Sequence, residues 1–294
     1  MKNNSDTIIE NIKTFLRINK KNQSELAEYL NMPRQSVSRI LNNNRDITAQ
    51  ELEKIAKFLN VDIKSLYETK TIKLDKIQTL YHGSYFPKFT PTYGLGDERH
   101  DYGKGFYLSI DPELAKEWAV CSSEDNGYLH KYELNTEGLK ILYLNERYGV
   151  LSWLAVLAKH RQADNSKRYK VNSEKLIKKY LPKRIEEYDV IVGYRADDSY
   201  FSFAKNAIKN NIDISLLDKI MRTGDLGYQI FLQSKKAFSQ ISEIKNKEGY
   251  FEEVDIDEYL LKYEERDHQA REEVAKLIDS EENTLEDTIE KYLG

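Results

Sequence analysis

Cysteine is nearly absent from this chain, because Cys121 is the only one among 294 residues. A lone cysteine excludes an internal disulfide and any multi-cysteine metal site, and it is typical of a reducing compartment. The chain also lacks an apolar run close to the roughly 20 residues that a membrane-spanning helix needs. Its N-terminus has no basic-then-apolar signal pattern. We therefore expect a cytoplasmic protein in which Cys121 is a small core residue.

Several nucleotide and metal motifs are missing as well. The sequence contains no P-loop, no GxGxxG after a predicted strand, no HExxH and no zinc-type spacing. His100, His130, His160 and His268 have no second ligand at a metal-like spacing. We therefore expect no metal cofactor.

What is present is typical of a globular chain with more than one domain. The 40% hydrophobic and 32% charged residues lie in the globular range, and the length is about twice that of a typical domain. The charge is uneven: residues 1–68 carry 11 basic against 9 acidic side chains, residues 69–250 carry 29 against 24, and residues 251–294 carry 5 against 16. We predict three parts, at residues 1–70, 71–250 and 251–294.

The first part has the pattern of short packed helices. Apolar residues recur at helical spacing through residues 7–67. Leu26 and Ala27 of one predicted helix are expected to face Val37 of the next, with the small alanine where two helices cross closely. The spacing therefore predicts a helix-turn-helix.

Polar residues and a proline mark the ends of these helices. Ser24 stands at the front of the first helix and Thr48 at the front of a later one, where hydroxyl side chains cap free N–H groups. Pro33 falls in the first turn of the second helix, where its missing N–H does no harm. Asn31 occupies the turn, which favours a left-handed backbone.

This pattern resembles the Xre and Cro-like repressor family over residues 8–67. The resemblance implies that the second helix faces the major groove and the phosphates of DNA. The contacting residues that it implies are Arg34, Gln35, Ser36, Ser38 and Arg39. The alternative is a domain that forms a homodimer or binds a protein partner such as an antitoxin, because its basic excess is modest for phosphate binding.

From residue 80 the sequence changes to short strand-like segments. Six are predicted strands: YHGS (81–84), GKGFYLS (103–109), LHKYEL (129–134), LKILYL (139–144), YDVIVGYRA (188–196) and GYQIFLQS (227–234). Helical spacing predicts helices at 112–120, 149–161, 173–181 and 199–221. The fold class is therefore α+β, with an all-α helix-turn-helix domain followed by a split, mixed β-sheet with helices and an acidic helical tail.

Three of these segments carry glycine or polar residues where a ligand can bind. Glycine lets a backbone approach a ligand closely, and a histidine at a strand end exposes ring and backbone groups. The residues are His82, Gly83 and Ser84 in the first segment, Gly105 and Tyr107 in the second, and Gln229 in the third. Each has a structural alternative, since a lone histidine is often satisfied within the fold and a tyrosine is often core.

Taken together, the segments resemble the ADP-ribosyltransferase superfamily, and within it a bacterial family of unknown function. Five blocks recur in order: YHGS at 81–84, DYGKGFY at 101–107, AKEWA at 115–119, YDVIVGYRADD at 188–198 and YQ at 228–229. The resemblance covers about residues 78–245. It implies a split sheet whose central strands line a cleft for nicotinamide adenine dinucleotide (NAD).

The resemblance also implies roles for the residues of three strands. His82 hydrogen-bonds the adenosine-side ribose, while the backbone of Gly83 holds the nicotinamide amide. Tyr107 stacks on the cationic nicotinamide ring. Gln229 contacts the nicotinamide ribose, where the glycosidic bond breaks through an oxocarbenium-like state.

Further NAD contacts are implied at the edges of these blocks. Ser84 and Gly105 adjoin the cofactor, and Arg195 pairs with its pyrophosphate. Asp197 and Asp198 are expected near the rim of the cleft, or alternatively as caps of the following helix.

Gln229 departs from the wider superfamily, which has glutamate at this position. A glutamate stabilises the cationic transition state by its charge, and losing one preorganised group of this kind costs about 3 kcal/mol. The closer family resembles this chain in having glutamine. Three outcomes stay open: a working transferase, an NAD glycohydrolase, and a catalytically silent NAD-binding transcriptional regulator.

The acidic segment 251–294 is predicted to form one or two amphipathic helices. Its apolar stripe comprises Leu260, Leu261, Val274, Leu277, Ile278 and Ile289. One interpretation is that the stripe packs on the core. The other is that the carboxylates cover a basic cleft and mimic a phosphate ligand.

We therefore expect an NAD-dependent ADP-ribosyltransferase, a toxin or phage-defence effector that modifies a protein or nucleic acid acceptor. Its helix-turn-helix domain regulates or targets it through DNA. NAD is the expected substrate, without a metal and without a membrane partner. A protein-interaction module that binds no ligand is a further alternative.

Overall fold

The computed structural model describes most of the chain. The described residues are 8–9, 11–13, 15–16, 21–42, 44–67, 73–161, 164–196, 198–223, 227–245, 251–279 and 283–294. Among the helices of these residues, none has the length and apolar character that a membrane crossing requires.

The chain divides into two compact units. The first comprises residues 1–72 with the short segment 146–150, and the second comprises residues 73–145 and 151–294. The acidic segment 251–294 belongs to the second unit.

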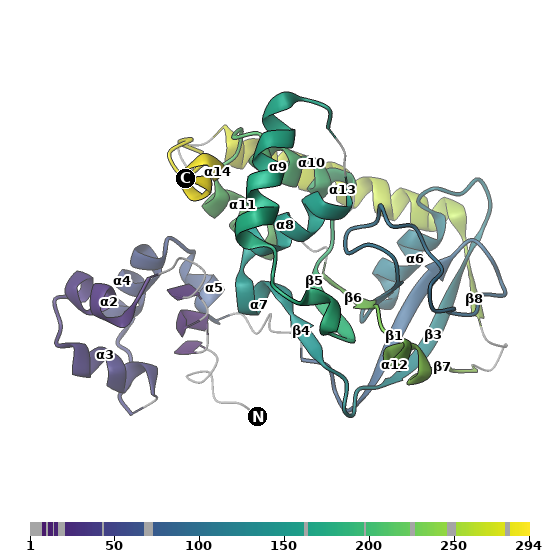
Figure 1. Ribbon diagram of the computed structural model, residues 1–294, viewed down its shortest axis with the longest axis horizontal. Helices are drawn as coiled ribbons and strands as arrows, with labels where there is room; N and C mark the ends of the chain where they lie inside the picture. The colour runs from purple at the N-terminus through teal and green to yellow at the C-terminus, as the bar shows by residue number, and fades with distance from the viewer. Residues whose placement is uncertain are drawn as a thin grey trace. The chain divides into compact units, whose positions relative to one another are not determined.

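The first unit contains the helix-turn-helix. Its helices include α2 (Gln23–Leu30), α3 (Arg34–Leu41), α4 (Ala49–Leu59) and α5 (Ile63–Tyr67) (Figure 1). Leu26 and Ala27 of α2 and Val37 of α3 are buried in one apolar cluster, as their spacing predicts. This core holds α3 against α2, which leaves the other side of α3 for a partner.

Side chains cap these helices, with one correction to the sequence interpretation. Asn22, not Ser24, caps α2: its Oδ1 accepts the backbone N–H groups of Ser24 and Glu25 at 2.9 and 3.1 Å. Glu25 in turn accepts the backbone N–H of Asn22 at 2.6 Å, which completes a capping box. Ser24 is therefore the second residue of the helix. Thr48 caps α4 through a second capping box with Glu51, as predicted.

The turn between α2 and α3 has the predicted geometry. Asn31 adopts a left-handed conformation with a φ of 52°, and its backbone N–H donates to the last turn of α2. Pro33 directly precedes α3, where its missing N–H costs nothing.

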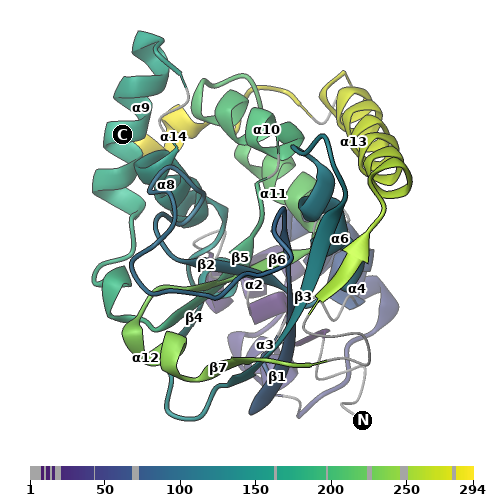
Figure 2. The same ribbon diagram turned by 90° about the vertical axis from the view of Figure 1, so that its right-hand side faces the viewer.

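The second unit is built on an eight-stranded sheet. Its strands are β1 (Ile77–Ser84), β2 (Phe106–Ser109), β3 (Gly127–Asn135), β4 (Ile141–Tyr143), β5 (Val190–Tyr194), β6 (Tyr228–Leu232), β7 (Ile241–Glu243) and β8 (Phe251–Val254) (Figure 2). The order is β4-β5-β6-β2-β1-β3-β7, and β8 pairs with β3. The six predicted strands are confirmed, whereas β7 and β8 are strands that the sequence pattern misses.

The sheet is mixed and open near its centre. β4 and β5 pair in parallel, and the other neighbours pair antiparallel. β1 and β2 share a single register pair, Tyr81 with Ser109, whereas β1 pairs with β3 from Ile77 to Ser84. The two central strands therefore diverge, as expected for a split sheet.

Helices surround the sheet. The remaining helices are α6 (Pro112–Val120), α7 (Leu144–Tyr148), α8 (Val150–His160), α9 (Lys167–Tyr180), α10 (Asp198–Ile208), α11 (Ile214–Thr223), α12 (Lys235–Ser239), α13 (Ile256–Ile278) and α14 (Ile289–Leu293), with a short 3₁₀ turn at Ile185–Glu187. α9 begins before the predicted residue 173. The single helix predicted at 199–221 is two, because the chain turns at Asn210, whose φ is 66°.

Helix α13 of the acidic segment packs on α6 through apolar and basic residues. α13 runs beside α6 in both ribbon views (Figures 1 and 2). Arg266 of α13 pairs with Glu117 of α6 at 2.7 Å, and the buried Tyr259 donates its hydroxyl to Glu113 at 3.0 Å. Leu261, placed in the predicted apolar stripe, is 56% exposed. The contact between α13 and α6 thus pairs the cations of the acidic segment with the carboxylates of α6.

Cys121 also differs from the expectation. It forms the C-cap of α6 and is partly exposed. It lies at the end of a helix, where the chain leaves the apolar core formed by Ala115 and Ala119.

Candidate functional site

The predicted DNA-contacting residues all lie on α3. Arg34, Gln35 and Arg39 are exposed, and Ser36 and Ser38 are partly exposed. Because the apolar residues of α3 point into the core of the first unit, these five side chains form its outward surface. The surface offers two guanidinium groups for phosphates or guanines and an amide for a base edge.

In the second unit, Gln229 lies at the centre of the sheet and is 3% exposed. It stands on β6 opposite Ser109 of β2 and Gly193 of β5. Its Nε2 donates to Oδ2 of Asp101 at 2.8 Å and to the carbonyl oxygen of Tyr194 at 3.3 Å. Since both partners are acceptors, the amide orientation is fixed and Oε1 faces the remaining side.

Asp101 is the hub of this arrangement. Besides Gln229, its carboxylate accepts Nη1 of Arg161 at 3.0 Å and the backbone N–H of Ala196 at 2.9 Å. Burial raises the pKa of the Asp101 carboxyl, while the positive charge of Arg161 and the hydrogen bonds lower it. The Arg161 guanidinium also donates to the carbonyl oxygen of Ala196 at 2.8 Å. Four segments that are distant in the sequence therefore meet at one buried carboxylate.

The backbone at Tyr194 closes the other side of Gln229. The carbonyl oxygen of Tyr194 accepts the hydroxyl of Tyr102 at 2.8 Å and Nε1 of Trp153 at 3.0 Å. Tyr102 and Trp153 are both buried. Aromatic side chains with their polar ends satisfied thus form a rigid wall behind the amide of Gln229.

Tyr107 shares a sheet face with Gln229. In the antiparallel pair of β2 and β6, Tyr107 stands opposite Phe231 and Ser109 stands opposite Gln229, so all four side chains project from one face. The ring of Tyr107 contacts that of Phe231 at 4.8 Å between centroids. Its hydroxyl donates to the carbonyl oxygen of Gly103 at 2.7 Å and accepts the backbone N–H of Tyr102 at 3.0 Å. Burial raises the pKa of Tyr107, so the phenol stays neutral.

His82 reaches β2 from the neighbouring strand. Its Nδ1 donates to the carbonyl oxygen of Tyr107 at 2.8 Å, and its ring lies between Phe89 and Phe106 at centroid distances of 4.8 and 4.7 Å. Burial lowers the pKa of His82 to about 4. The imidazole is therefore neutral near pH 7, with its proton on Nδ1 and with Nε2 as an acceptor. Because Phe106 and Tyr107 alternate along β2, the His82 ring lies on the face opposite the Tyr107 ring.

The glycines and serine of these blocks serve close packing and a turn. A Cβ atom at Gly83 would lie 2.0 Å from the carbonyl oxygen of Ala115, so only glycine lets α6 approach β1 this closely. A Cβ atom at Gly105 would lie 2.4 Å from the carbonyl oxygen of Leu232. Ser84 is buried, and its Oγ accepts the backbone N–H of Phe86 at 3.1 Å, which fixes the chain after β1.

The remaining predicted residues follow β5. Arg195 is 5% exposed, and its guanidinium carbon lies 4.1 Å from the centroid of the Trp118 ring on α6. Asp198 begins α10, but its side chain lies outside the described part of the structure, as does the whole of Asp197. Sequence reasoning thus identified the segment but missed the stacking of Arg195 on Trp118.

The structure brings Tyr107 and Gln229 together on one face, with His82 joined through the Tyr107 backbone. Two members of the cluster, Asp101 and Arg161, were missed as site residues. Asp101 opens the DYGKGFY block, so its position inside a recurring pattern was an available signal. Arg161 carried no local signal, because it lies at the end of a helix that the sequence marks only by apolar spacing. Among the described residues, no cluster of three or more His, Cys, Asp or Glu side chains could hold a metal ion.

Comparisons with known proteins cover both units. Residues 12–66 match a family model described as helix-turn-helix, which includes the exposed surface of α3. Residues 78–242 match the model of the DUF3990 family, described as proteins of unknown function. This match spans more than half of the chain and includes β1 to β6 with the cluster around Gln229. The chain belongs to the DUF3990 family.

The DUF3990 match assigns the second unit to a family, but the description of this family names no activity. Neither the curated proteins nor the solved structures contain a match to the chain. The helix-turn-helix match supports DNA binding by the first unit. The chain is therefore a DNA-binding helix-turn-helix domain joined to a DUF3990 domain of mixed sheet and helices.

Proposed function

We propose that the DUF3990 domain is an NAD-dependent ADP-ribosyltransferase. The observation that carries the proposal is the placement of His82, Tyr107 and Gln229 on three neighbouring strands, in the order β1, β2, β6. These strands include the pair that diverges at the centre of the sheet. On the sheet face that Tyr107 and Gln229 share, a phenol ring and an oriented amide suit a flat, polar ligand such as nicotinamide ribose.

The reaction breaks the bond between C1′ of the ribose and the nicotinamide nitrogen. The bonding electrons go to the pyridinium ring, so nicotinamide leaves as a neutral molecule and positive charge develops on the ribosyl group. An oxygen or nitrogen of the acceptor attacks C1′ and loses its proton to the surroundings. Oε1 of Gln229 accepts a ribose hydroxyl, while His82 positions Tyr107 through the hydrogen bond from its Nδ1 to the carbonyl oxygen of Tyr107.

Asp101 supplies the negative charge that Gln229 lacks. Its carboxylate lies 2.8 Å from Nε2 of Gln229 and is buried, where a charge acts more strongly than it does in water. Arg161, whose Nη1 lies 3.0 Å from Oδ1 of Asp101, favours the ionised carboxylate, whereas burial acts in the opposite direction and raises the pKa of Asp101. The pair of Asp101 and Gln229 thus performs together what a single glutamate performs alone: it places an acceptor oxygen at the ribose and a negative charge behind it.

The primary experiment measures NAD turnover by the purified full-length protein. NAD labelled on the adenylate phosphate is incubated with the protein and cell lysate, followed by protease or nuclease digestion and an assay of free nicotinamide. We expect label in a macromolecule, and we expect Gln229→Ala to lower nicotinamide release by about 100-fold, as for loss of one preorganised transition-state contact. The matched control is Gln233→Ala, which removes a glutamine that binds the carbonyl oxygens of Ile185 and Tyr188 instead.

Three results of this experiment oppose the proposal. Release of nicotinamide without label transfer would identify a glycohydrolase, and NAD binding without release would identify a silent NAD-binding regulator. The absence of NAD binding would exclude the transferase, the glycohydrolase and the NAD-binding regulator.

A charge exchange tests the role of Asp101. Gln229→Glu places two carboxylates in hydrogen-bond contact, which raises the pKa of one of them and holds a proton between them. We expect Gln229→Glu and Asp101→Asn each to lose at least about tenfold in nicotinamide release. The double variant Asp101→Asn/Gln229→Glu restores one charge and one amide, so it should recover most of the activity. A double variant no better than Asp101→Asn would exclude charge compensation.

The helix-turn-helix domain regulates or targets this activity. A transferase that modifies host macromolecules is a toxin or phage-defence effector, and a DNA-binding domain on the same chain provides control at its own operon or delivery to nucleic acid. The exposed arginines of α3 support the DNA contact. A chromatin-immunoprecipitation experiment that recovers the upstream region of its own gene supports control at the operon, whereas recovery of DNA without sequence preference supports delivery.

A further inference from the structure

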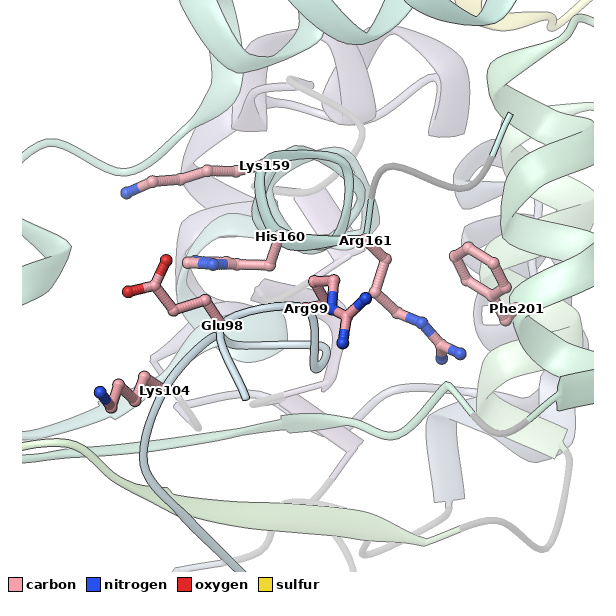
Figure 3. A pocket seen from close by; sticks show the side chains of 7 residues that line it. All are labelled: Glu98, Arg99, Lys104, Lys159, His160, Arg161 and Phe201. Carbon is pink, nitrogen blue, oxygen red and sulfur yellow. The ribbon is translucent and has the colours of Figure 1, made fainter. Parts of the chain in front are cut away.

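A basic cleft lies beside the Asp101 cluster. It has a volume of about 790 Å³ and is lined by Glu98, Arg99, Lys104, Lys159, His160, Arg161 and Phe201 (Figure 3). The lining comes from three segments: the loop of residues 98–104, the end of α8, and α10. The cleft lies within the second unit, and its lining includes four permanently cationic side chains against one carboxylate.

Among the residues that the structure describes, two of these cations have no carboxylate partner. Lys104 and Lys159 are exposed, and among the described residues neither forms an ion pair. Arg99, in contrast, pairs with Asp97 at 2.7 Å, and Arg161 pairs with Asp101. A cation in the last turn of a helix is favoured by the helix dipole. The dipole of α8 therefore accounts for an unpaired lysine at position 159, but it does not account for the unpaired Lys104 across the cleft. Like charges that face one hollow from two segments attract an anion.

The cleft also offers flat surfaces. The guanidinium carbon of Arg161 lies 4.0 Å from the centroid of the Phe201 ring, and Figure 3 shows the two side chains near each other at one end of the cleft. His160 extends toward the opposite end (Figure 3), and burial lowers its pKa, so this ring is neutral near pH 7. Guanidinium and aromatic planes flanked by lysines are the elements that proteins use for unpaired nucleotides.

We propose that this cleft binds a single strand of nucleic acid, with Lys104 and Lys159 on its phosphates and the planes of Arg161 and Phe201 against a base. The cleft is open to solvent, as the binding of a strand requires. The first unit of the same chain is a DNA-binding domain, so nucleic acid is a partner that the chain meets. This proposal concerns binding and holds whether or not the sheet centre cleaves NAD.

The cleft is physically connected to the proposed reaction site. Arg161 contacts Phe201 in the cleft and Asp101 in the cluster, and Asp101 contacts Gln229. A strand in the cleft therefore lies one side chain away from the carboxylate behind Gln229. If the proposed transferase function holds, this strand is the acceptor of ADP-ribose, and a base or a sugar hydroxyl provides the attacking atom.

The test uses the full-length protein with its α3 contacts removed. In an Arg34→Ala/Arg39→Ala background, fluorescence anisotropy measures binding of a labelled single-stranded oligonucleotide, as DNA and as RNA, without NAD. We expect Lys104→Ala/Lys159→Ala to weaken binding by about tenfold and to reduce the salt slope by about 1.4, because each single-strand phosphate contact contributes about 0.7. The matched control is Lys170→Ala/Lys178→Ala, which removes two exposed lysines of α9 and should leave the affinity within about twofold.

Two outcomes would overturn the proposal. Equal weakening by the two lysine pairs would mean that net charge, not the cleft, attracts the strand. If Lys104→Ala/Lys159→Ala instead leaves strand binding intact and weakens NAD binding in a parallel titration, the cleft holds the pyrophosphate of the dinucleotide. Loss of NAD turnover in Gln229→Ala with unchanged strand binding separates this proposal from the transferase proposal.

Discussion

The outward surface of α3 and the cluster around Gln229 are built in opposite ways. The surface of α3 comes from five of six consecutive residues on one helix, and its three longest polar side chains are exposed. The cluster comes from residues 101, 161, 196 and 229, and its carboxylate and amide are buried and already paired. Exposed side chains can be replaced without changing the stability of the fold, whereas the side chains of a buried, hydrogen-bonded cluster also contribute to that stability.

The difference also appears in the electrostatics. Guanidinium groups on α3 are surrounded by water, where they exchange freely between phosphates and solvent. Asp101 and His82 have pKa values shifted by burial, as is typical of residues with a chemical role. We therefore expect substitutions in the cluster to lower the free energy of unfolding, and substitutions on the α3 surface to lower only the affinity for DNA.

The largest effect is expected at the hub of the cluster. Asp101→Ala leaves Arg161, Gln229 and the N–H of Ala196 without their common acceptor, and removing one partner of a buried ion pair costs about 3–5 kcal/mol of unfolding free energy. Both tryptophans lie in the second unit, so urea unfolding followed by tryptophan fluorescence reports this unit. Asp97→Ala, which removes an exposed partner of Arg99, is the control and should unfold as the wild type does. Equal midpoints for Asp101→Ala and the wild type would mean that the cluster does not support the fold.

His82 should make the second unit sensitive to acid. The pKa of about 4 in the folded protein lies below the ordinary histidine value of 6.5, so the unfolded chain binds the proton first as pH falls. Stability from neutral His82 is present above pH 6.5 and is lost progressively down to about pH 4, with a total of about 3 kcal/mol at most. Residues 1–72 contain no histidine, so the first unit lacks this sensitivity.

The measurement compares wild type and His82→Gln by urea unfolding at pH 7, 5.5 and 4. The side chain of glutamine can donate to the carbonyl oxygen of Tyr107 but does not titrate. The wild type should lose more stability than the variant over this range, and parallel losses in the two proteins would disprove the assignment.

The α3 surface should respond in binding alone. Arg34→Ala/Arg39→Ala removes two exposed cations, so the affinity for a duplex from upstream of the gene should fall at least about tenfold, and the salt slope should fall by about 1.8. Lys54→Ala/Lys57→Ala on α4 removes the same charge from exposed positions away from α3. Fluorescence anisotropy distinguishes the two pairs. If both pairs lose affinity equally, the first unit attracts DNA only by its charge.

The smallest effect is expected at the cap of α2. Asn22→Ala removes the oxygen that accepts two N–H groups, at a cost of about 1 kcal/mol. Ser24→Ala changes the exposed second residue of the helix, so it should cost nothing. Thermal unfolding followed by far-ultraviolet circular dichroism compares the two variants, and a larger loss for Ser24→Ala would restore Ser24 as the cap.

Local patterns predicted most of the elements because their causes lie within a few residues. The capping box at Thr48 and the left-handed turn at Asn31 each depend on neighbouring residues, and α6 begins and ends where its proline and apolar spacing indicate. β7 and β8 were missed because three- and four-residue strands form only where β3 offers a free edge. Long-range pairing of this kind leaves little trace in a local pattern.

The residues of the candidate site likewise comprise some that local motifs identify and others that only the folded structure shows. Recurring blocks identified His82, Tyr107 and Gln229, but not that Gly83 and Gly105 are required for close packing of α6 and β6. Nor could they identify Arg161 as the partner of Asp101, since 60 residues separate the two.

The sequence alone determined the helix-turn-helix, the α+β class and the order of the strands along the chain, because periodicity, caps and turn residues act over short distances. The tertiary structure decided which polar groups meet: Asp101 behind Gln229, Arg195 on Trp118, and Lys104 across a cleft from Lys159. A hydrogen bond or a shared charge depends on positions a few ångströms apart in space, and only the folded chain sets those positions.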